Sequence, residues 1–411
     1  MTDLETVKSF RLRAKEWLVG NMERGSALEQ RPEYDDDHAW ADFQRALQKK
    51  VFDDGFAGIM YPKEYGGLGL TRAHQQAFRE EAASYVMPVQ YAVTHGILGP
   101  TLLDFGTEEQ KRTYIPAMLA GDMWVQFLSE PSAGSDMAGV LTRAARDGDT
   151  YVLNGSKIWS TSAAFSDYAM ALCRTNWDAP KHRGLSMIIL PIRHPGVTVQ
   201  PIKLVDETAH SCQEFIDDAV VPAENLLGSE NDGWTVASRV LFHERNQVGE
   251  NSLDDTPFRT SDGADGEIDE LAALAERLGV SADPVARQKV GEGIVLEGLQ
   301  QHAVTRIDAE MRSGRIAGPG ASLLKLMHSL IEYRRAELAM EIAGPYALAS
   351  PENTPGLSVG VRYLRARAST VAGGTNEMQR NQIAERVLDL PREANPDKDL
   401  PFNQTLRNNA R

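Results

Sequence analysis

Two short strings in the first half of the chain contain residue types that could bind a planar ligand. The first, FLSEPSAGSDMAG, includes Ser129, Gly134 and Ser135, and small residues let a ligand approach the backbone closely. The second, NGSKIWSTSA, places Trp159 two residues before Thr161. On a strand, alternate side chains share a face, so this pair offers a ligand a flat wall and a hydroxyl. A turn rich in serine and glycine also suits an ordinary β-hairpin loop, but the two strings together favour a site for a planar ring with polar edges.

These strings resemble the flavin-binding segment of the acyl-CoA dehydrogenase family. The resemblance implies FAD as the cofactor, bound by the backbone and hydroxyl groups of Leu128, Ser129, Gly134, Ser135, Trp159 and Thr161. The first signature of the family usually begins with a small residue, and Phe127 stands there in this chain. The other signature positions fit the family pattern.

The resemblance also implies a reaction. Acyl-CoA dehydrogenases take a proton from the α-carbon of a thioester and pass a hydride from its β-carbon to the flavin, which gives a trans-2-enoyl-CoA. Such chemistry needs a carboxylate in a dry pocket, where loss of hydration raises its pKa toward the range in which a general base works best. It also needs hydrogen-bond donors to the thioester oxygen, on which negative charge develops in the transition state.

In many family members the base lies just before a Gly-Thr pair near the C-terminus, but the matching position in this chain is Gly373. A second arrangement in the family puts the base on the first long helix of the C-terminal domain, immediately before an arginine. The string RVLFHERNQVGE matches it, so we predict Glu244 as the catalytic base. Arg245 is then expected to organise the acyl-CoA end of the pocket. The alternatives are an exposed helix face with weak surface ion pairs and, less favoured, His243 as the base.

The Gly-Gly-Thr string near the C-terminus carries further expectations. The main-chain N–H of Gly373 is expected to donate to the thioester oxygen, as the family's residue there does. Gly373 and Ala372 also leave volume near the α-carbon for acyl groups with branches or rings. Thr375 and Glu377 are expected to bind FAD, with Glu377 facing either the adenosine side of the cofactor or solvent.

Three segments must position these residues. Hydrophobic spacing predicts helices over residues 1–122, short strands over residues 123–235 and helices again over residues 236–411. The class is α+β, and the resemblance specifies an N-terminal helical domain, a middle β-barrel or β-sandwich domain and a C-terminal four-helix-bundle domain. Within the last segment, residues 251–270 are rich in Asp, Ser, Thr and Gly, which predicts a solvated loop.

A long helix is also predicted over Ser322–Gly344, and the pair Gly344 and Pro345 marks its end. The spacing of its large apolar residues predicts that one face packs through Leu323, Leu326, Met327, Leu330 and Leu338.

The composition limits the functional classes. Of the 411 residues, 42% are hydrophobic and 25% are charged, as in ordinary globular proteins. A net charge of −15 disfavours nucleic acids and anionic membranes as partners, and no apolar run reaches the ~18 residues of a transmembrane helix. The N-terminus lacks an apolar targeting segment, and Cys173 and Cys212 form no metal or disulfide pattern. The expected compartment is therefore the cytoplasm.

Two family strings that complete the FAD site of a neighbouring subunit are altered. The Arg-x-x-Phe-Gly string has no clear match in residues 274–293, and EIAGPYA replaces the Gln-x-x-Gly-Gly-x-Gly string. The chain is therefore expected either to pair with a related acyl-CoA dehydrogenase chain or to form a divergent homo-oligomer through other contacts, such as Arg287. Electron-transfer flavoprotein is the expected electron acceptor. Two other functions stay open: a flavin monooxygenase or oxidase on the same fold, and a non-catalytic subunit of a heteromeric dehydrogenase.

Overall fold

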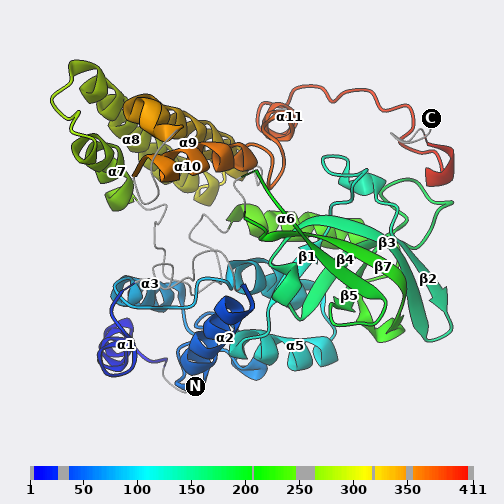
Figure 1. Cartoon of the computed structure of the whole chain (residues 1–411). Helices are drawn as coiled ribbons and strands as arrows, with labels where there is room; N and C mark the ends of the chain where they lie inside the picture. The colour runs from blue at the N-terminus through cyan, green and yellow to red at the C-terminus, as the bar shows by residue number, and fades with distance from the viewer. Residues whose placement is uncertain are drawn as a thin grey trace. The chain divides into compact units, whose positions relative to one another are not determined.

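The computed structural model describes residues 4–25, 37–205, 208–246, 264–316, 320–348 and 355–405. Contacts between residues divide the chain into two units. Unit 1 contains the first helices, the sheet, helix α6 (Gly233–Asn246) and the residues from 395 onward. Unit 2 contains the helices from α7 (Ala264–Arg277) to α11 (Asn376–Arg386) (Figure 1). The mixture of helices with a sheet confirms the predicted α+β class.

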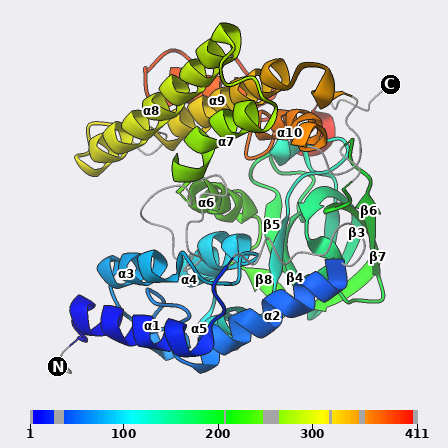
Figure 2. The same ribbon diagram turned by 60° about the vertical axis from the view of Figure 1, so that its left-hand side comes forward.

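The N-terminal part of unit 1 is helical, as predicted. Its helices are α1 (Val7–Asn21), α2 (Asp37–Asp53), α3 (Arg72–Ala82), α4 (Gly99–Phe105) and α5 (Glu108–Ala120). Polar residues begin two of them, since the Thr6 hydroxyl accepts from the N–H of Ser9 and Thr107 forms a capping box with Gln110. Within unit 1, Figure 2 shows these helices gathered on one side of the sheet.

The predicted short strands are present in the middle of the chain. They are β1 (Trp124–Phe127), β2 (Arg143–Asp147), β3 (Thr150–Thr161), β4 (Tyr168–Arg174), β5 (Leu185–Pro191), β6 (Val197–Ile202), β7 (Ser211–Pro222) and β8 (Leu226–Leu227). Within the described residues they form one sheet in the order β6-β7-β3-β2-β4-β5-β8, with β1 paired to β4. Both faces of β5 are buried, because Met187 and Ile189 join one core cluster while Ile188 and Leu190 join another.

Helix α6 follows the last strand and packs against β5. Its residues Val236, Ala237 and Val240 are fully buried in the core cluster that also contains residues of β4 and β5. Gly233 begins the helix, and a Cβ at this position would lie 2.5 Å from the backbone of Ser186. The close approach of α6 to the sheet therefore requires glycine there.

Unit 2 is a group of helices around α9 (Ala321–Ala343), which contacts α7, α8 (Pro284–Arg312), α10 (Pro355–Ser369) and α11. The loop predicted over residues 251–270 is wrong in its last part, because α7 already begins at Ala264. Residues 251–263 lie outside the described residues. Among the described residues, no helix has the length and apolar content that crossing a membrane requires.

The predicted packing face of α9 is largely wrong. Leu330 is 47% exposed, and Leu323, Leu326 and Met327 are only half-buried. The buried side instead carries Ile331, Leu338 and Ile342 together with small residues such as Ala336 and Ala339. The reason is that α9 has several helical neighbours, and small side chains are buried where helices approach closely. The predicted end is confirmed, because Gly344 caps the helix with a φ of +55°.

A buried carboxyl group lies between β3 and β7. Glu214 of β7 is fully buried, and the hydroxyl of Ser160 on β3 donates to its Oε2 at 3.1 Å. Its Oε1 accepts no hydrogen bond within the described part of the chain. Burial raises the pKa of Glu214 to about 7, although the Ser160 hydrogen bond and the charge of Lys157 act in the opposite direction.

We predict that the substitution Glu214→Gln removes a pH-dependent loss of stability. The folded-state pKa of about 7 lies above the ordinary value of 4.5. The stability that the neutral acid contributes is therefore complete below pH ~4.5 and is lost as the pH rises to about 7. This shift corresponds to roughly 3 kcal/mol. Urea unfolding between about pH 4 and about pH 8 should show the variant gaining up to that amount over the parent chain as the pH rises.

The matched control is Glu109→Gln, which removes an exposed carboxylate on α5. Its unfolding free energy should follow the parent chain at every pH. A constant difference between Glu214→Gln and the parent across the range would contradict the prediction.

Candidate functional site

The first string forms a tight turn that lies against the second. The main chains of Glu130 and Ala133 exchange two hydrogen bonds of 3.0 Å each, and the carbonyl of Ser129 accepts from the N–H of Ile158 at 3.1 Å. Ser129 is half-buried, whereas Gly134 and Ser135 are exposed. The structure therefore brings the two strings together at one end of the sheet, within unit 1.

A buried ion pair fixes this turn. Lys157 of β3 has no exposed surface, and its Nζ donates to Glu130 Oε1 at 2.9 Å, to the Leu128 carbonyl at 3.3 Å and to the Leu172 carbonyl at 2.6 Å. The other carboxylate oxygen of Glu130 accepts from the N–H of Leu141 at 2.6 Å. Burial opposes ionisation of Glu130, but Lys157 and these hydrogen bonds outweigh it and lower the pKa of the carboxyl.

The strand β3 contains an irregularity at Trp159. Its register with β7 shifts between Ile158 and Ser160, and Trp159 has a φ of +68°, which is uncommon for a residue with a side chain. Strict alternation would put Trp159 on the buried side with Lys157. The irregularity instead buries Ser160 and leaves Trp159 59% exposed, with Thr161 also exposed. Trp159 and Thr161 are thus both exposed, but the cause is the bulge in β3 and not regular strand alternation.

These features fit a flavin ring. Strained backbone positions cluster at ligand-binding sites, and Trp159 at such a position offers an exposed aromatic ring to a ligand. The exposed side of the turn is open, because a Cβ at Gly134 would meet nothing within 4 Å. Leu128 is buried and offers only its backbone. The arrangement leaves room for a planar molecule with hydroxyls and main-chain groups at its edges.

Gln126 is a further candidate for the site, and it was not among the residues predicted from the sequence. This residue lies on β1, and its buried Oε1 accepts no hydrogen bond among the described residues. A buried acceptor without a donor costs free energy, so Gln126 is a candidate to receive an N–H group of a ligand. The available signal was a polar residue inside the apolar string WVQF, one residue before the first signature.

The end of α6 carries the predicted base. Glu244 and Arg245 are both half-buried, so the alternative of an exposed helix face is not favoured. Glu244 follows the buried Val240 by one helical turn, and residues four apart lie on the same face of a helix. Glu244 therefore continues the buried stripe of α6 toward its C-terminal end.

His243 has a structural partner. Its Nε2 lies 2.9 Å from Oδ2 of Asp104 on α4, and the same oxygen accepts from Arg239 Nε at 3.0 Å. Burial lowers the pKa of His243, although Asp104 acts in the opposite direction. These contacts hold α6 against α4 and engage the imidazole, which weakens the case for His243 as the base.

The Gly-Gly-Thr turn lies in unit 2 and is internally fixed. Gly373 and Gly374 have φ values of +66° and +87°, and the side-chain amide of Gln379 donates to both of their carbonyls at 3.0 and 3.1 Å. Thr375 caps α11 by accepting from the N–H of Met378 at 3.2 Å. Glu377 is exposed, with its carboxylate 3.4 Å from Arg380. A glutamate would rarely adopt the backbone conformation found at Gly373, so this turn is built for glycine.

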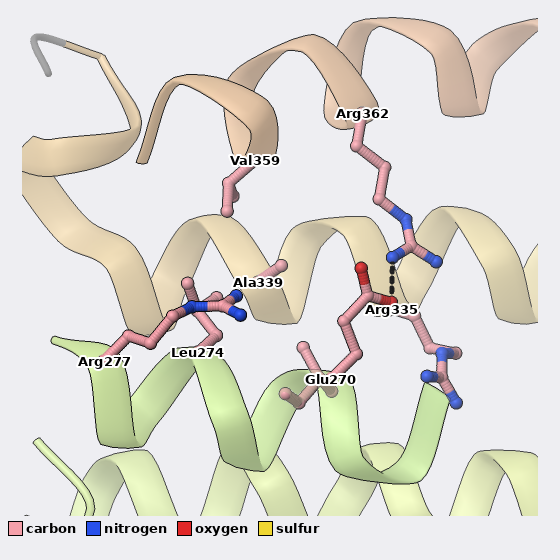
Figure 3. Close-up of a pocket in the computed structure, with 8 residues that line it drawn as sticks. Glu270, Leu274, Arg277, Arg335, Ala339, Val359 and Arg362 are labelled. Atoms are coloured by element: carbon pink, nitrogen blue, oxygen red, sulfur yellow. Dashed lines mark hydrogen bonds and ion pairs between the residues drawn. The ribbon is translucent and has the colours of Figure 1, made fainter. Parts of the chain in front are cut away.

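A cavity of about 80 Å³ lies between α7, α9 and α10 of unit 2. Figure 3 shows its lining, in which apolar residues such as Leu274 and Val359 lie beside Arg277, Arg335 and Arg362. It is smaller than the pockets that hold organic ligands, which measure roughly 300–1,000 Å³. Arg362 is also already paired with Glu270. This cavity is therefore not a candidate for the cofactor or the thioester.

Within the described ranges, no cluster of metal-ligating side chains occurs.

Comparison with known proteins identifies the family. The N-terminal, middle and C-terminal domain models of acyl-CoA dehydrogenases match residues 23–122, 126–218 and 231–388. The chain is 35% identical over 399 residues to "Acyl-CoA dehydrogenase IpdE1" of Mycobacterium tuberculosis, which covers 95% of this chain and 100% of that protein. It is 34% identical over 361 residues to "Acyl-CoA dehydrogenase FadE29" of the same species, which covers 85% of this chain and 89% of that protein.

Two solved structures are similar along nearly the whole chain. A chain of "Tcur3481-Tcur3483 steroid ACAD" has a TM-score of 0.72 and 26% identity, and covers 95% of this chain and 100% of its own length. A chain of the ChsE4-ChsE5 complex from Mycobacterium tuberculosis has a TM-score of 0.71 and 29% identity. The match covers 96% of this chain and 100% of that chain. The chain therefore belongs to the acyl-CoA dehydrogenase family and is an oxidoreductase that acts on acyl-CoA.

Proposed function

We propose that this protein catalyses the FAD-dependent α,β-dehydrogenation of an acyl-CoA thioester to a trans-2-enoyl-CoA, with Glu244 as the base. The observation that carries the proposal is the position of Glu244, a half-buried residue at the end of an otherwise buried helical stripe. Gly373, which has no acid–base group, stands where many relatives have their base. A general base must reach the proton that it removes. Contacts at Gly233 and Asp104 hold helix α6 in place, and this fixes the position of the Glu244 backbone.

The remaining residues have supporting roles in this proposal. The hydroxyls of Ser129, Ser135 and Thr161 and the main chain at Leu128 and Gly134 would hold the polar edges of FAD. Trp159 would contact its ring, and the Oε1 of Gln126 would accept one of its N–H groups. When bound, FAD accepts the hydride from the β-carbon. Thr375 and Glu377 are also assigned to FAD, with Glu377 on either the adenosine side of the cofactor or the solvent side.

The thioester is oriented by two further residues. The N–H of Gly373 donates to the thioester oxygen, where it stabilises the charge that develops as the proton leaves. Arg245 organises the acyl-CoA end of the pocket.

We propose a bulky, ring-bearing acyl group as the substrate class. One similar structure is that of a steroid ACAD, and we expect the small residues Gly373 and Ala372 to leave volume near the α-carbon. A panel of straight, branched and ring-bearing thioesters distinguishes this class from ordinary fatty acyl groups.

For the assembly, we propose a complex with a related acyl-CoA dehydrogenase chain. Two similar structures are titled as pairs of different chains. In this chain, Glu341 stands where the family has the glutamine of its interface string, and it is paired with Lys289 and Arg334. Helix α8 also exposes apolar side chains, with Val285 61% and Val295 60% accessible. Electron-transfer flavoprotein is the proposed electron acceptor.

The base assignment predicts a specific defect in Glu244→Gln. The variant should retain its FAD, and reduction of the flavin by its acyl-CoA substrate should slow on the order of 10³-fold, because general-base catalysis contributes to the chemical step alone. Anaerobic stopped-flow bleaching of the flavin measures the rate. Glu109→Gln on α5 is the control and should react like the parent. Parent-like reduction by Glu244→Gln would remove the carboxylate from the mechanism.

The cofactor assignment predicts that Trp159→Ala weakens FAD binding by about tenfold, since the variant loses an aromatic surface against the ring. Titration of the apoprotein with FAD, followed by flavin fluorescence, gives the dissociation constant. Phe215→Ala on β7 removes another partly exposed ring (40% accessible) and should leave the constant unchanged. Equal affinity of the Trp159 variant and the parent would refute the assignment.

The assembly proposal predicts fewer flavins than subunits. In a complex with the related partner, the number of FAD molecules per chain should be below one. Flavin absorbance gives the amount of FAD, and light scattering gives the mass of the particle. A homotetramer of this chain alone that holds one FAD per subunit would contradict the proposal.

A further inference from the structure

The end of the chain returns to the β domain of unit 1. Residues 395–405, here called the C-terminal strap, contact the loop between β4 and β5. The N–H of Phe402 donates to the Ala179 carbonyl at 2.9 Å, and the N–H of Asn403 donates to the Trp177 carbonyl at 3.1 Å. The side chain of Asn403 also donates to Asp178 at 2.7 Å. The strap is therefore held by specific hydrogen bonds.

Phe402 is the anchor of the strap. Its side chain is 1% exposed, and its ring centroid lies 5.6 Å from that of Trp177 and 3.5 Å from the guanidinium carbon of Arg174. Arg174 is itself fully buried. A cation over an aromatic face is attracted most strongly when it is shielded from water. The strap therefore covers a buried positive charge at the end of β4.

Arg174 also holds the segment that follows the cofactor turn. Its Nη2 donates to the Ala138 carbonyl at 2.6 Å, and its Nε donates to the Val140 carbonyl at 3.3 Å. Its Nη1 donates to the carbonyl of Lys181, at 3.0 Å, in the loop that receives the strap. The ammonium of Lys181 lies 2.5 Å from Asp136. The residues directly after Ser135 are thus fixed by the same groups that contact the strap.

We propose that the C-terminal strap is a positioning element for the cofactor. Phe402, acting through Arg174, holds the segment from Ser135 to Val140 in the conformation that receives FAD. This inference rests on the proposed function, because it takes Ser135 to bind FAD. By linkage, if the strap favours bound FAD, then FAD favours the docked strap to the same degree.

Two measurements on the full-length chain test this coupling. Phe402→Leu keeps apolar volume but loses the ring face, and it should raise the dissociation constant for FAD about tenfold. In the parent, adding FAD to the apoprotein should slow hydrogen exchange of the peptide that contains Phe402 and Asn403 several-fold. A strap with a purely structural role would not respond to FAD.

Asn403→Ala removes an exposed strap contact and should raise the dissociation constant for FAD a few-fold. This variant keeps the test possible if Phe402→Leu does not fold. The control is Lys398→Ala, which changes an exposed residue of the same strap and should leave the dissociation constant unchanged. Unchanged FAD affinity in the Phe402 and Asn403 variants, or unchanged strap exchange on adding FAD, would overturn the inference. Failure of the parent chain to bind FAD both alone and in complex with the related partner chain would instead refute the proposed function.

Discussion

The buried ion pair between Lys157 and Glu130 is the interaction on which the candidate site depends. Removing two charges from water costs several kcal/mol per ion, and only complete hydrogen bonding offsets this cost. Here the three donors of the lysine ammonium find three acceptors, and both oxygens of Glu130 accept main-chain N–H groups in addition. Loss of either partner leaves an uncompensated charge. The ion pair therefore stabilises the observed conformation of the turn before Ser135.

A second buried cation holds the other end of the same string. Lys157 binds the carbonyl of Leu128, and Arg174 binds those of Ala138 and Val140. Both side chains are fully buried, and both act mainly through main-chain acceptors. Between these points, main-chain hydrogen bonds join Glu130 with Ala133 and an ion pair joins Asp136 with Lys181, while the small residues Gly134 and Ser135 stay exposed. Their exposed surface is available to a ligand, which is the arrangement expected of a preorganised site.

The proposed base illustrates how a family can keep its chemistry after losing a residue. A glutamate at Gly373 would face a left-handed backbone conformation in this chain, so that turn is suited to a main-chain donor. Glu244 instead lies on a helix whose buried face, formed by Val236, Ala237 and Val240, is packed in the core of unit 1. A carboxylate on a well-packed helix is held more firmly than one on a loop. In this proposal, the carboxylate therefore comes from the helix and the main-chain donor comes from the glycine turn.

The sequence by itself determined the order of helical and β segments, the family and the candidate cofactor strings, because these depend on local spacing and on side-chain type. It did not determine which face of α9 is buried or where α7 begins, and it gave no sign that Gln126 lacks a hydrogen-bond donor. The exposure of Trp159 arises from a bulge in the pairing of β3 with β7, and the docking of Phe402 on Arg174 joins residues more than two hundred positions apart. Burial and hydrogen-bond satisfaction are properties of neighbours brought together by folding, so only the tertiary structure could decide them.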